Sequence, residues 1–274
     1  MIRRRFAVLV CALVAAALVP AAASAAPTWA PASSAAIHPG VMTFTDGAQC
    51  TANFVFFDAT DIYIGQAAHC SGTGGATETN GCDSGSLPVG TPVEVDGASQ
   101  PGTMVYNSWL TMQAKGETDP NTCDYNDFAL IRLNPADHGK VNPSVPFWSG
   151  PNAVGATTQL RDKVYSYGNS SLRLGVSQLS PKEGYSLGDG GGGGGWTHTV
   201  YTLTPGIPGD SGSAFLSKSG AALGVLSTVA IAPVTGSNGV GDVAKELSYM
   251  QANSSFSGVS LALGTEPFHA GSLP

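Results

Sequence analysis

The sequence is poor in charged residues, and in cations above all. Of its 274 residues, 12 are Lys or Arg and 19 are Asp or Glu. The first 25 residues hold three of the cations and none of the acids, so the rest of the chain has a net charge of about −10. An acidic chain with few cations repels phosphate backbones and anionic lipid surfaces. We therefore expect neither nucleic acid nor a membrane among its partners.

Long apolar runs are scarce after the start of the chain. Three arginines precede an uncharged apolar stretch, Phe6–Val19, and a small-x-small motif, Ala23-Ser24-Ala25, follows it. This order is typical of a secretory signal peptide of residues 1–25, and the stretch is too short for a stable anchor. A lipoprotein signal at Cys11 is disfavoured because Cys11 lies in the middle of the stretch. The later apolar run Ala221–Val234 is short and is interrupted by Gly and Pro.

Cysteine is rare, and four cysteines remain after residue 25: Cys50, Cys70, Cys82 and Cys123. An even number of cysteines in an exported chain favours two disulfides, for which three pairings exist. A structural zinc site is disfavoured because no pair has the C-x-x-C spacing. We expect no metal and no cofactor.

Helical periodicity is scarce, while short runs rich in branched and aromatic residues are frequent. Strands are predicted at residues 51–57, 62–64, 128–133, 163–167, 197–203 and 224–231. One helix is predicted at Asp242–Ala252, with Asp242 as its cap. Many short strands joined by Gly- and Pro-rich turns indicate an all-β fold, either a sandwich or a barrel.

The composition also divides the chain. Residues 26–36 are rich in Pro, Ala and Ser and are expected to form a disordered leader. A linker with four prolines, 135–154, separates two strand-rich parts, 37–134 and 155–274. Gly190–Gly195 is interpreted as a flexible loop, because the helix N-terminus that a phosphate-binding loop needs does not follow it.

Three short motifs carry residue types that can take part in catalysis: Ala67-Ala68-His69-Cys70, Asp127-Phe128-Ala129-Leu130 and Pro208-Gly209-Asp210-Ser211-Gly212-Ser213. A serine hydroxyl is a weak nucleophile until an imidazole takes its proton. The imidazole in turn needs a carboxylate on its other nitrogen. Glycines beside the serine allow backbone N–H groups to converge on an oxyanion.

In this order and spacing, the motifs closely resemble those of the trypsin/chymotrypsin superfamily, from Ile37 to the C-terminus. The resemblance implies two six-stranded antiparallel β-barrels with a short C-terminal helix, and a secreted serine endopeptidase that acts on polypeptides, which we expect to be a monomer. It implies His69 as general base and acid, Asp127 as its orienting partner and Ser211 as nucleophile. The N–H groups of Gly209 and Ser211 would form the oxyanion hole.

The resemblance also implies the Cys50–Cys70 disulfide next to the histidine, and with it Cys82–Cys123. Ser227-Thr228-Val229 matches the strand that pairs with the substrate backbone. Because the start Ile37-His38-Pro39-Gly40 echoes the family's mature N-terminus only faintly, activation through a new amino group is not expected.

The residue six before the nucleophile, which forms the base of the specificity pocket in the family, is Pro205, with Gly206 beside it. Glutamate-specific members often have His where this chain has Leu226. These residues predict an uncharged pocket that prefers apolar side chains, although an acid such as Asp189 could reach it and favour a basic one.

Two other functions compete with the peptidase. Gly209-Asp210-Ser211 also opens the signature of GDS-type lipases and esterases, but those enzymes place Ser first in the chain and Asp and His near its end. A non-catalytic homologue that binds peptides is the second alternative.

Other polar residues have simpler interpretations. Asp119, Asn121 and Asp124 form an oxygen-rich turn that lacks a calcium-ligand pattern and is interpreted as solvated. His198 lies in a predicted strand and could also line the cleft.

Overall fold

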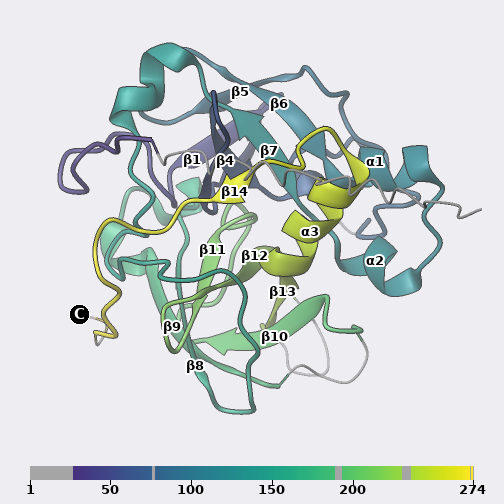
Figure 1. The fold of residues 1–274 in the computed structure, drawn as a ribbon. Helices are drawn as coiled ribbons and strands as arrows, with labels where there is room; N and C mark the ends of the chain where they lie inside the picture. Colours follow the sequence, from purple (N-terminus) through teal and green to yellow (C-terminus); the bar gives the residue numbers. More distant parts are fainter. Residues whose placement is uncertain (1–26, 76–77, 189–192, 230–235, 272, 274) are drawn as a thin grey trace, which may run out of the picture.

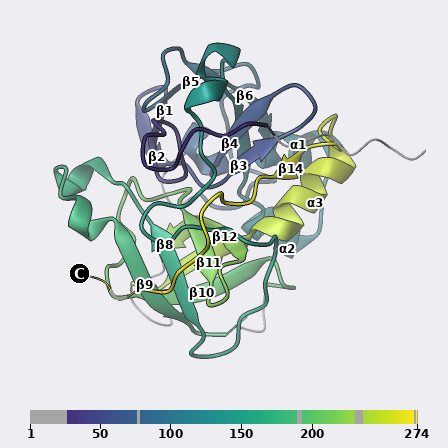
Figure 2. The same cartoon turned by 60° about the vertical axis from the view of Figure 1, so that its left-hand side comes forward.

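The fold consists of two antiparallel β units and a few helices. The computed structural model describes residues 27–75, 78–188, 193–229, 236–271 and 273. The two units lie one above the other, and helix α3 (Val243–Asn253) lies at the side where they meet (Figures 1 and 2).

The first unit is an eight-stranded sheet in the order β14-β3-β4-β7-β6-β5-β1-β2. Its strands are β1 (Met42–Thr45), β2 (Ala48–Thr51), β3 (Val55–Phe57), β4 (Ile62–Gln66), β5 (Pro92–Val95), β6 (Gly102–Asn107), β7 (Ala129–Arg132) and β14 (Ser260–Leu261). Branched and aliphatic side chains such as Ile64, Val93 and Ile131 form its core and are fully buried. Removing this apolar surface from water is the main force that folds the sheet around its core.

The second unit is a closed six-stranded barrel in the order β10-β13-β12-β11-β8-β9. Its strands are β8 (Lys163–Tyr167), β9 (Pro181–Ser186), β10 (Thr197–Thr202), β11 (Ala214–Ser217), β12 (Ala222–Val229) and β13 (Asn238–Asp242). Val164, Val200, Phe215, Leu223 and Val240 fill its interior.

The predicted all-β class with two β units is confirmed, and the structure revises two of its details. The first unit has eight strands rather than six. One of them, β14, comes from the C-terminal part of the chain and pairs with β3, so residues 155–274 do not all belong to the second barrel (Figure 1). Leu261 and Ala262 are buried there against the first unit. Strand periodicity predicts that a segment is extended, but not which sheet edge it joins.

The C-terminal helix is confirmed. It begins after Asp242, whose carboxylate accepts a hydrogen bond from the Lys245 N–H at 2.9 Å. Two helices were not predicted, α1 (Ser108–Lys115) and α2 (Pro120–Tyr125). Helices this short depend on caps and packing more than on periodicity.

One residue of the oxygen-rich turn, Asp119, is the N-terminal cap of α2. The carboxylate of Asp119 accepts from the N–H and the hydroxyl of Thr122, both at 2.8 Å. Asp124 accepts from the amide of Asn80 at 3.2 Å.

Residues 27–36, expected to be a disordered leader, pack on the first unit instead. Trp29 lies edge-on to Phe57 with ring centroids 6.1 Å apart, and the N–H of Ala30 donates to the carbonyl of Val141. A composition rich in Pro and Ala does not reveal the packing of one large aromatic ring. Within the glycine run, residues 190–192 lie outside the described residues.

The four cysteines pair as the resemblance implies. Cys50–Cys70 connects β2 to a 3-10 turn, Ala68–Ser71, and Cys82–Cys123 connects a loop to α2. Among the described residues, no helix has the length and apolarity needed to cross a membrane.

Candidate active site

His69 lies in the 3-10 turn that follows β4. Its Nδ1 lies 2.6 Å from Oδ2 of Asp127, and its backbone N–H donates to Oδ1 of the same carboxylate at 2.9 Å. Two bonds to one carboxylate fix both the main chain and the ring of His69. The neighbouring Cys70 is held by its disulfide to Cys50.

Asp127 lies two residues before the start of β7 and is buried. Besides His69, the hydroxyl of Ser227 donates to its Oδ2 at 2.6 Å. Burial raises the pKa of this carboxyl, but the charge of His69 and the hydrogen bonds from His69 and Ser227 lower it more, so that the pKa is below its usual value. Asp127 is therefore an anion that faces the imidazole.

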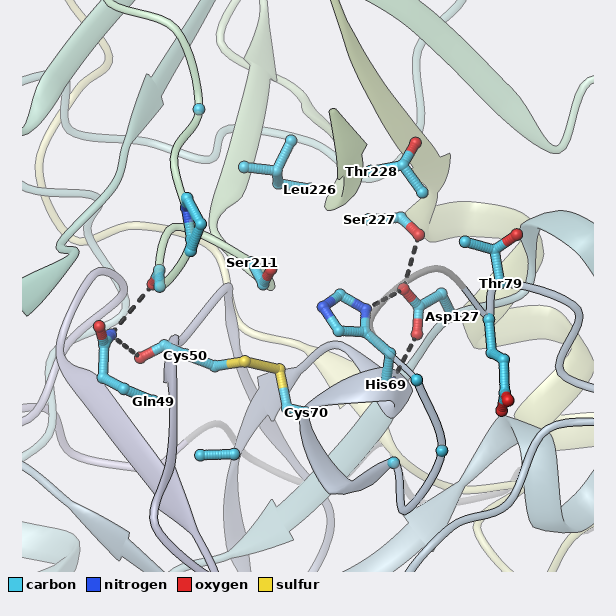
Figure 3. Close-up of a pocket in the computed structure, with 18 of the residues that line it drawn as sticks. Gln49, Cys50, His69, Cys70, Thr79, Asp127, Ser211, Leu226, Ser227 and Thr228 are labelled. Carbon is cyan, nitrogen blue, oxygen red and sulfur yellow. Dashed lines mark hydrogen bonds and ion pairs between the residues drawn. A yellow bond between two sulfur atoms is a disulfide. The ribbon is translucent and has the colours of Figure 1, made fainter. Parts of the chain in front are cut away.

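Ser211 lies in the turn between β10 and β11 and lines the same cleft as His69. Figure 3 shows Asp127 and Ser227 on one side of the imidazole and Ser211 on the other. The structure thus brings together the three side chains that the sequence predicted. The backbone carbonyl of Ser211 is anchored on the first unit by the N–H of Thr51 at 2.8 Å.

The turn around Ser211 needs glycine at two positions. Gly209 has φ +94° and Gly212 has φ +86°, a region that other residues seldom adopt. A Cβ on Gly212 would lie 2.6 Å from the carbonyl oxygen of Thr51. Among the described residues, the N–H groups of Gly209 and Ser211 have no hydrogen-bond acceptor. These two donors lie beside the serine hydroxyl and are available to an oxyanion.

The cleft that contains these groups has a volume of about 750 Å³. Two segments of the second unit contribute to its lining, residues 206–208 and 226–228. The ionisable residues among its described lining are His69, Glu78 and Asp127, and this lining includes neither Lys nor Arg.

Not every predicted pocket residue lies where the sequence placed it. Pro205 is exposed and is not among the described lining residues, although it precedes Gly206, which is. The placement of Pro205 at the base of the pocket therefore stays a prediction. The side chain of Val229 and the whole of Asp189 lie outside the described residues.

No family model and no curated relative matches this sequence. Solved structures do match. Protease A of Thermobifida fusca is 17% identical, with 84% of this chain and 100% of that chain covered and a TM-score of 0.53. A glutamic acid specific serine protease is 17% identical, with 82% and 100% covered and a TM-score of 0.52. Nocardiopsis protease is 17% identical, with 82% and 98% covered and a TM-score of 0.51.

The fold is that of the chymotrypsin-like serine proteases. At this level of identity the comparison concerns the fold alone, and the chemistry has to be argued from the residues of this chain.

Within this chymotrypsin-like fold, a buried charge cluster that was not predicted lies beneath the Ser211 turn. Oδ2 of Asp210 lies 2.5 Å from the guanidinium of Arg173 and 3.0 Å from the ammonium of Lys182. All three side chains are buried. Ile37, the residue that echoes the family's mature N-terminus, forms no hydrogen bond with Asp210 in the described part of the chain. Its backbone N–H donates to the carbonyl of Lys140 in the first unit. Asp210 is therefore neutralised by internal cations. No sequence signal connects residues so far apart.

A second missed feature is a hydrogen-bonded link between the two units. The carbonyl of Gly209 accepts from the Gln49 amide at 3.0 Å and from the Thr51 hydroxyl at 2.7 Å. Oε1 of Gln49 accepts from the N–H of Ser171 at 3.0 Å. Strand β2 of one unit thus holds the turn of the other.

Two remaining candidates have structural roles. Cys50, His69 and Cys70 have potential metal-ligand atoms within 4.8 Å of one another, but the two sulfurs are bonded to each other and so are unsuited to bind an ion. His198 is buried, pairs with Asp242 at 2.9 Å and is not among the described lining of the cleft.

Proposed function

We propose that this protein is a secreted serine endopeptidase that uses Ser211, His69 and Asp127 as its triad. The observation that carries the proposal is the order of groups across the cleft. A buried, ionised Asp127 holds one nitrogen of His69, while Ser211 lies on the far side of the ring. Beside it are two N–H groups that have no acceptor in the part of the chain that the structure describes. The two disulfides and the predicted signal peptide support export.

In this mechanism the hydroxyl of Ser211 attacks the carbonyl carbon of the scissile peptide, and Nε2 of His69 takes its proton. The carbonyl oxygen becomes an oxyanion that accepts hydrogen bonds from Gly209 and Ser211. Asp127 stabilises the imidazolium. His69 then gives the proton to the leaving amine, and an acyl-enzyme remains on Ser211.

Deacylation repeats the same steps with water. His69 takes a proton from the water as it attacks the ester, and returns that proton to Ser211 as the acid product leaves. Because His69 acts in turn as base and acid, its orientation by Asp127 matters in both halves of the reaction.

Substrate binding is assigned to the strand β12 side of the cleft. Ser227 and Thr228 line the cleft beside the triad. The hydroxyl of Ser227 is engaged by Asp127, so its backbone rather than its side chain would pair with an extended peptide. The solved structures of the same fold include serine proteases, which supports a peptide substrate.

The proposal is tested with Ser211→Ala. The variant should lose amide hydrolysis by about 10⁴-fold or more, because the oxyanion donors and substrate binding alone remain. Ser257→Ala, at an exposed serine outside the cleft, is the matched control and should keep full activity. A folded Ser211→Ala protein with wild-type activity would refute the triad.

The competing functions give different results in the same assay. An esterase would hydrolyse matched ester substrates while leaving amides intact. A non-catalytic homologue would bind peptides, and a phosphonylating reagent directed at serine would fail to label Ser211. An active peptidase should be labelled at Ser211 and not in Ser211→Ala.

A further inference from the structure

Behind the candidate triad lies a second carboxyl group, that of Glu246. It belongs to helix α3, and its side chain is completely buried. Its Oε1 accepts a hydrogen bond from the backbone N–H of Asp127 at 3.2 Å. Its Oε2 has no hydrogen-bond partner among the described residues. Glutamate is rarely buried without a partner, so this position calls for an explanation.

The space for this carboxyl is provided by a glycine on the neighbouring strand. A Cβ on Gly241 of β13 would lie 2.4 Å from Oε1 of Glu246. The backbone of Gly241 is not in the left-handed region, so its φ does not require glycine. The glycine therefore serves the fit of Glu246 against the chain before β7.

The charges that surround Glu246 are negative. Asp127 faces it from the turn before β7, and Asp242 from the start of its own helix. Asp242 is in turn paired with His198. Tyr106 of β6 is a further titratable group near Glu246. Among the described residues Glu246 forms no ion pair with a cation. Burial, together with the charges of Asp127 and Asp242, raises its pKa well above the usual value.

We propose that Glu246 is a positioning residue for the triad, a neutral carboxylic acid whose Oε1 holds the main chain of Asp127 in place. A neutral group can accept the N–H bond without placing a second negative charge behind the Asp127 carboxylate. The carboxylate of Asp127 is then aimed at His69 by its own main chain as well as by Ser227. This inference rests on the proposed peptidase function and concerns how its triad is held.

The test compares three variants with an exposed control. Glu246→Gln keeps an oxygen acceptor, so kcat should stay within about threefold of wild type. Glu246→Leu removes the acceptor and should lower kcat by about 10- to 100-fold with KM nearly unchanged, the size expected when catalytic groups are misplaced. Gly241→Ala leaves Glu246 in the chain but displaces it, and should lower kcat in the same way. Glu94→Gln, at an exposed position in β5, should change nothing.

The pH profile tests the neutral state. If Glu246 is uncharged, Glu246→Gln leaves the acid limb of kcat/KM, which reports His69, at the wild-type midpoint. A downward shift of about one pH unit in Glu246→Gln would show that Glu246 is ionised and would overturn the proposal. A purely structural role would lower the stability of Glu246→Leu while leaving kcat unchanged, and would overturn it as well.

A failure of this inference is distinguishable from a failure of the proposed function. Loss of activity in Ser211→Ala together with full kcat in Glu246→Leu would refute the inference alone. If the wild-type protein cleaves no peptide, the imidazole of His69 can still be titrated by NMR. Glu246→Leu should then shift its titration or its Nδ1–H resonance while Glu246→Gln does not, and unchanged spectra in both would refute the role of Glu246.

Discussion

The imidazole of His69 determines the pH range in which the candidate site can work. Burial lowers the pKa of His69, but the charge of Asp127 and its hydrogen bond raise it more, so the pKa is above the ordinary value. A protonated imidazole accepts no proton from Ser211. We therefore expect kcat/KM to fall as the pH is lowered through a midpoint above about 6.5.

Replacing Asp127 tests the origin of that midpoint. Asp127→Asn removes the anion and leaves burial as the dominant influence, so the acid limb should move to lower pH. The rate at neutral pH should fall by about 10⁴-fold, because the asparagine amide favours the wrong tautomer of the ring. Steady-state kinetics from pH 4 to 9 would measure both effects. A profile that keeps its wild-type midpoint would contradict the assigned pairing.

The buried cluster of Asp210, Arg173 and Lys182 contains two cations and one anion. Asp210→Asn would leave both cations buried without a counter-charge and should reduce the free energy of unfolding by about 3–5 kcal/mol. Burial lowers the pKa of Lys182, and the charge of Arg173 lowers it further, while Asp210 opposes both.

The same cluster offers a milder matched substitution. Lys182→Met keeps the Arg173–Asp210 pair intact and removes one buried charge, so it should cost less than about 1.5 kcal/mol. Urea unfolding of both variants would measure the difference. Equal losses in the two variants would show that the Arg173–Asp210 pair is not stable without Lys182 and would contradict this expectation.

The two disulfides differ in how directly they hold the candidate site. Cys50–Cys70 closes a loop with a sequence separation of 20 and attaches β2 to the turn that carries His69. A Cys50→Ala/Cys70→Ala variant should lose about 3 kcal/mol of stability by the chain-entropy estimate. It should also lose activity under conditions where it remains folded, because the turn beside His69 is released.

The second disulfide is the control for that prediction. Cys82–Cys123, with a separation of 41, closes a longer loop, so its removal should cost about 0.6 kcal/mol more in stability. It should have a smaller effect on kcat, since it does not hold the His69 turn. Thermal unfolding and kcat measured on the two double variants would separate the effects. A greater loss of kcat without Cys82–Cys123 would reverse the assignment.

The cleft between the two β units determines which peptides fit. Apart from His69, Asp127 and Glu78, its described lining consists of uncharged residues, including Gly206, Ile207 and Leu226. A buried Lys or Arg of the substrate would lose its hydration without gaining a partner, and a Glu would meet no cation in this lining. We expect a preference for apolar residues on the acyl side of the cut bond.

Matched peptides with Leu, Phe, Arg or Glu before the scissile bond would measure this preference as kcat/KM. The Leu or Phe peptide should be cleaved best. A tenfold advantage for Arg, about 1.4 kcal/mol in transition-state binding, would indicate an acid in the pocket. The same advantage for Glu would indicate a cation, and either result would contradict the uncharged pocket.

The sequence by itself determined the features that depend on local chemistry. Runs of branched and aromatic residues predicted six of the fourteen strands that the structure describes, and Asp242 predicted the start of α3. Three short motifs named the members of the candidate triad. The strand and helix predictions succeed because backbone propensity and capping each leave a signal within a few neighbouring residues. The triad remains a proposal that rests on motifs of the same local kind.

The tertiary structure alone decided which distant residues meet. Glu246 reaches the N–H of Asp127 across 119 positions, and Arg173 reaches Asp210 across 37. Strand β14 joins the first unit although it follows the second in the chain. Such contacts arise when buried surfaces pack and buried charges need partners, and neither requirement is confined to neighbouring residues of the chain.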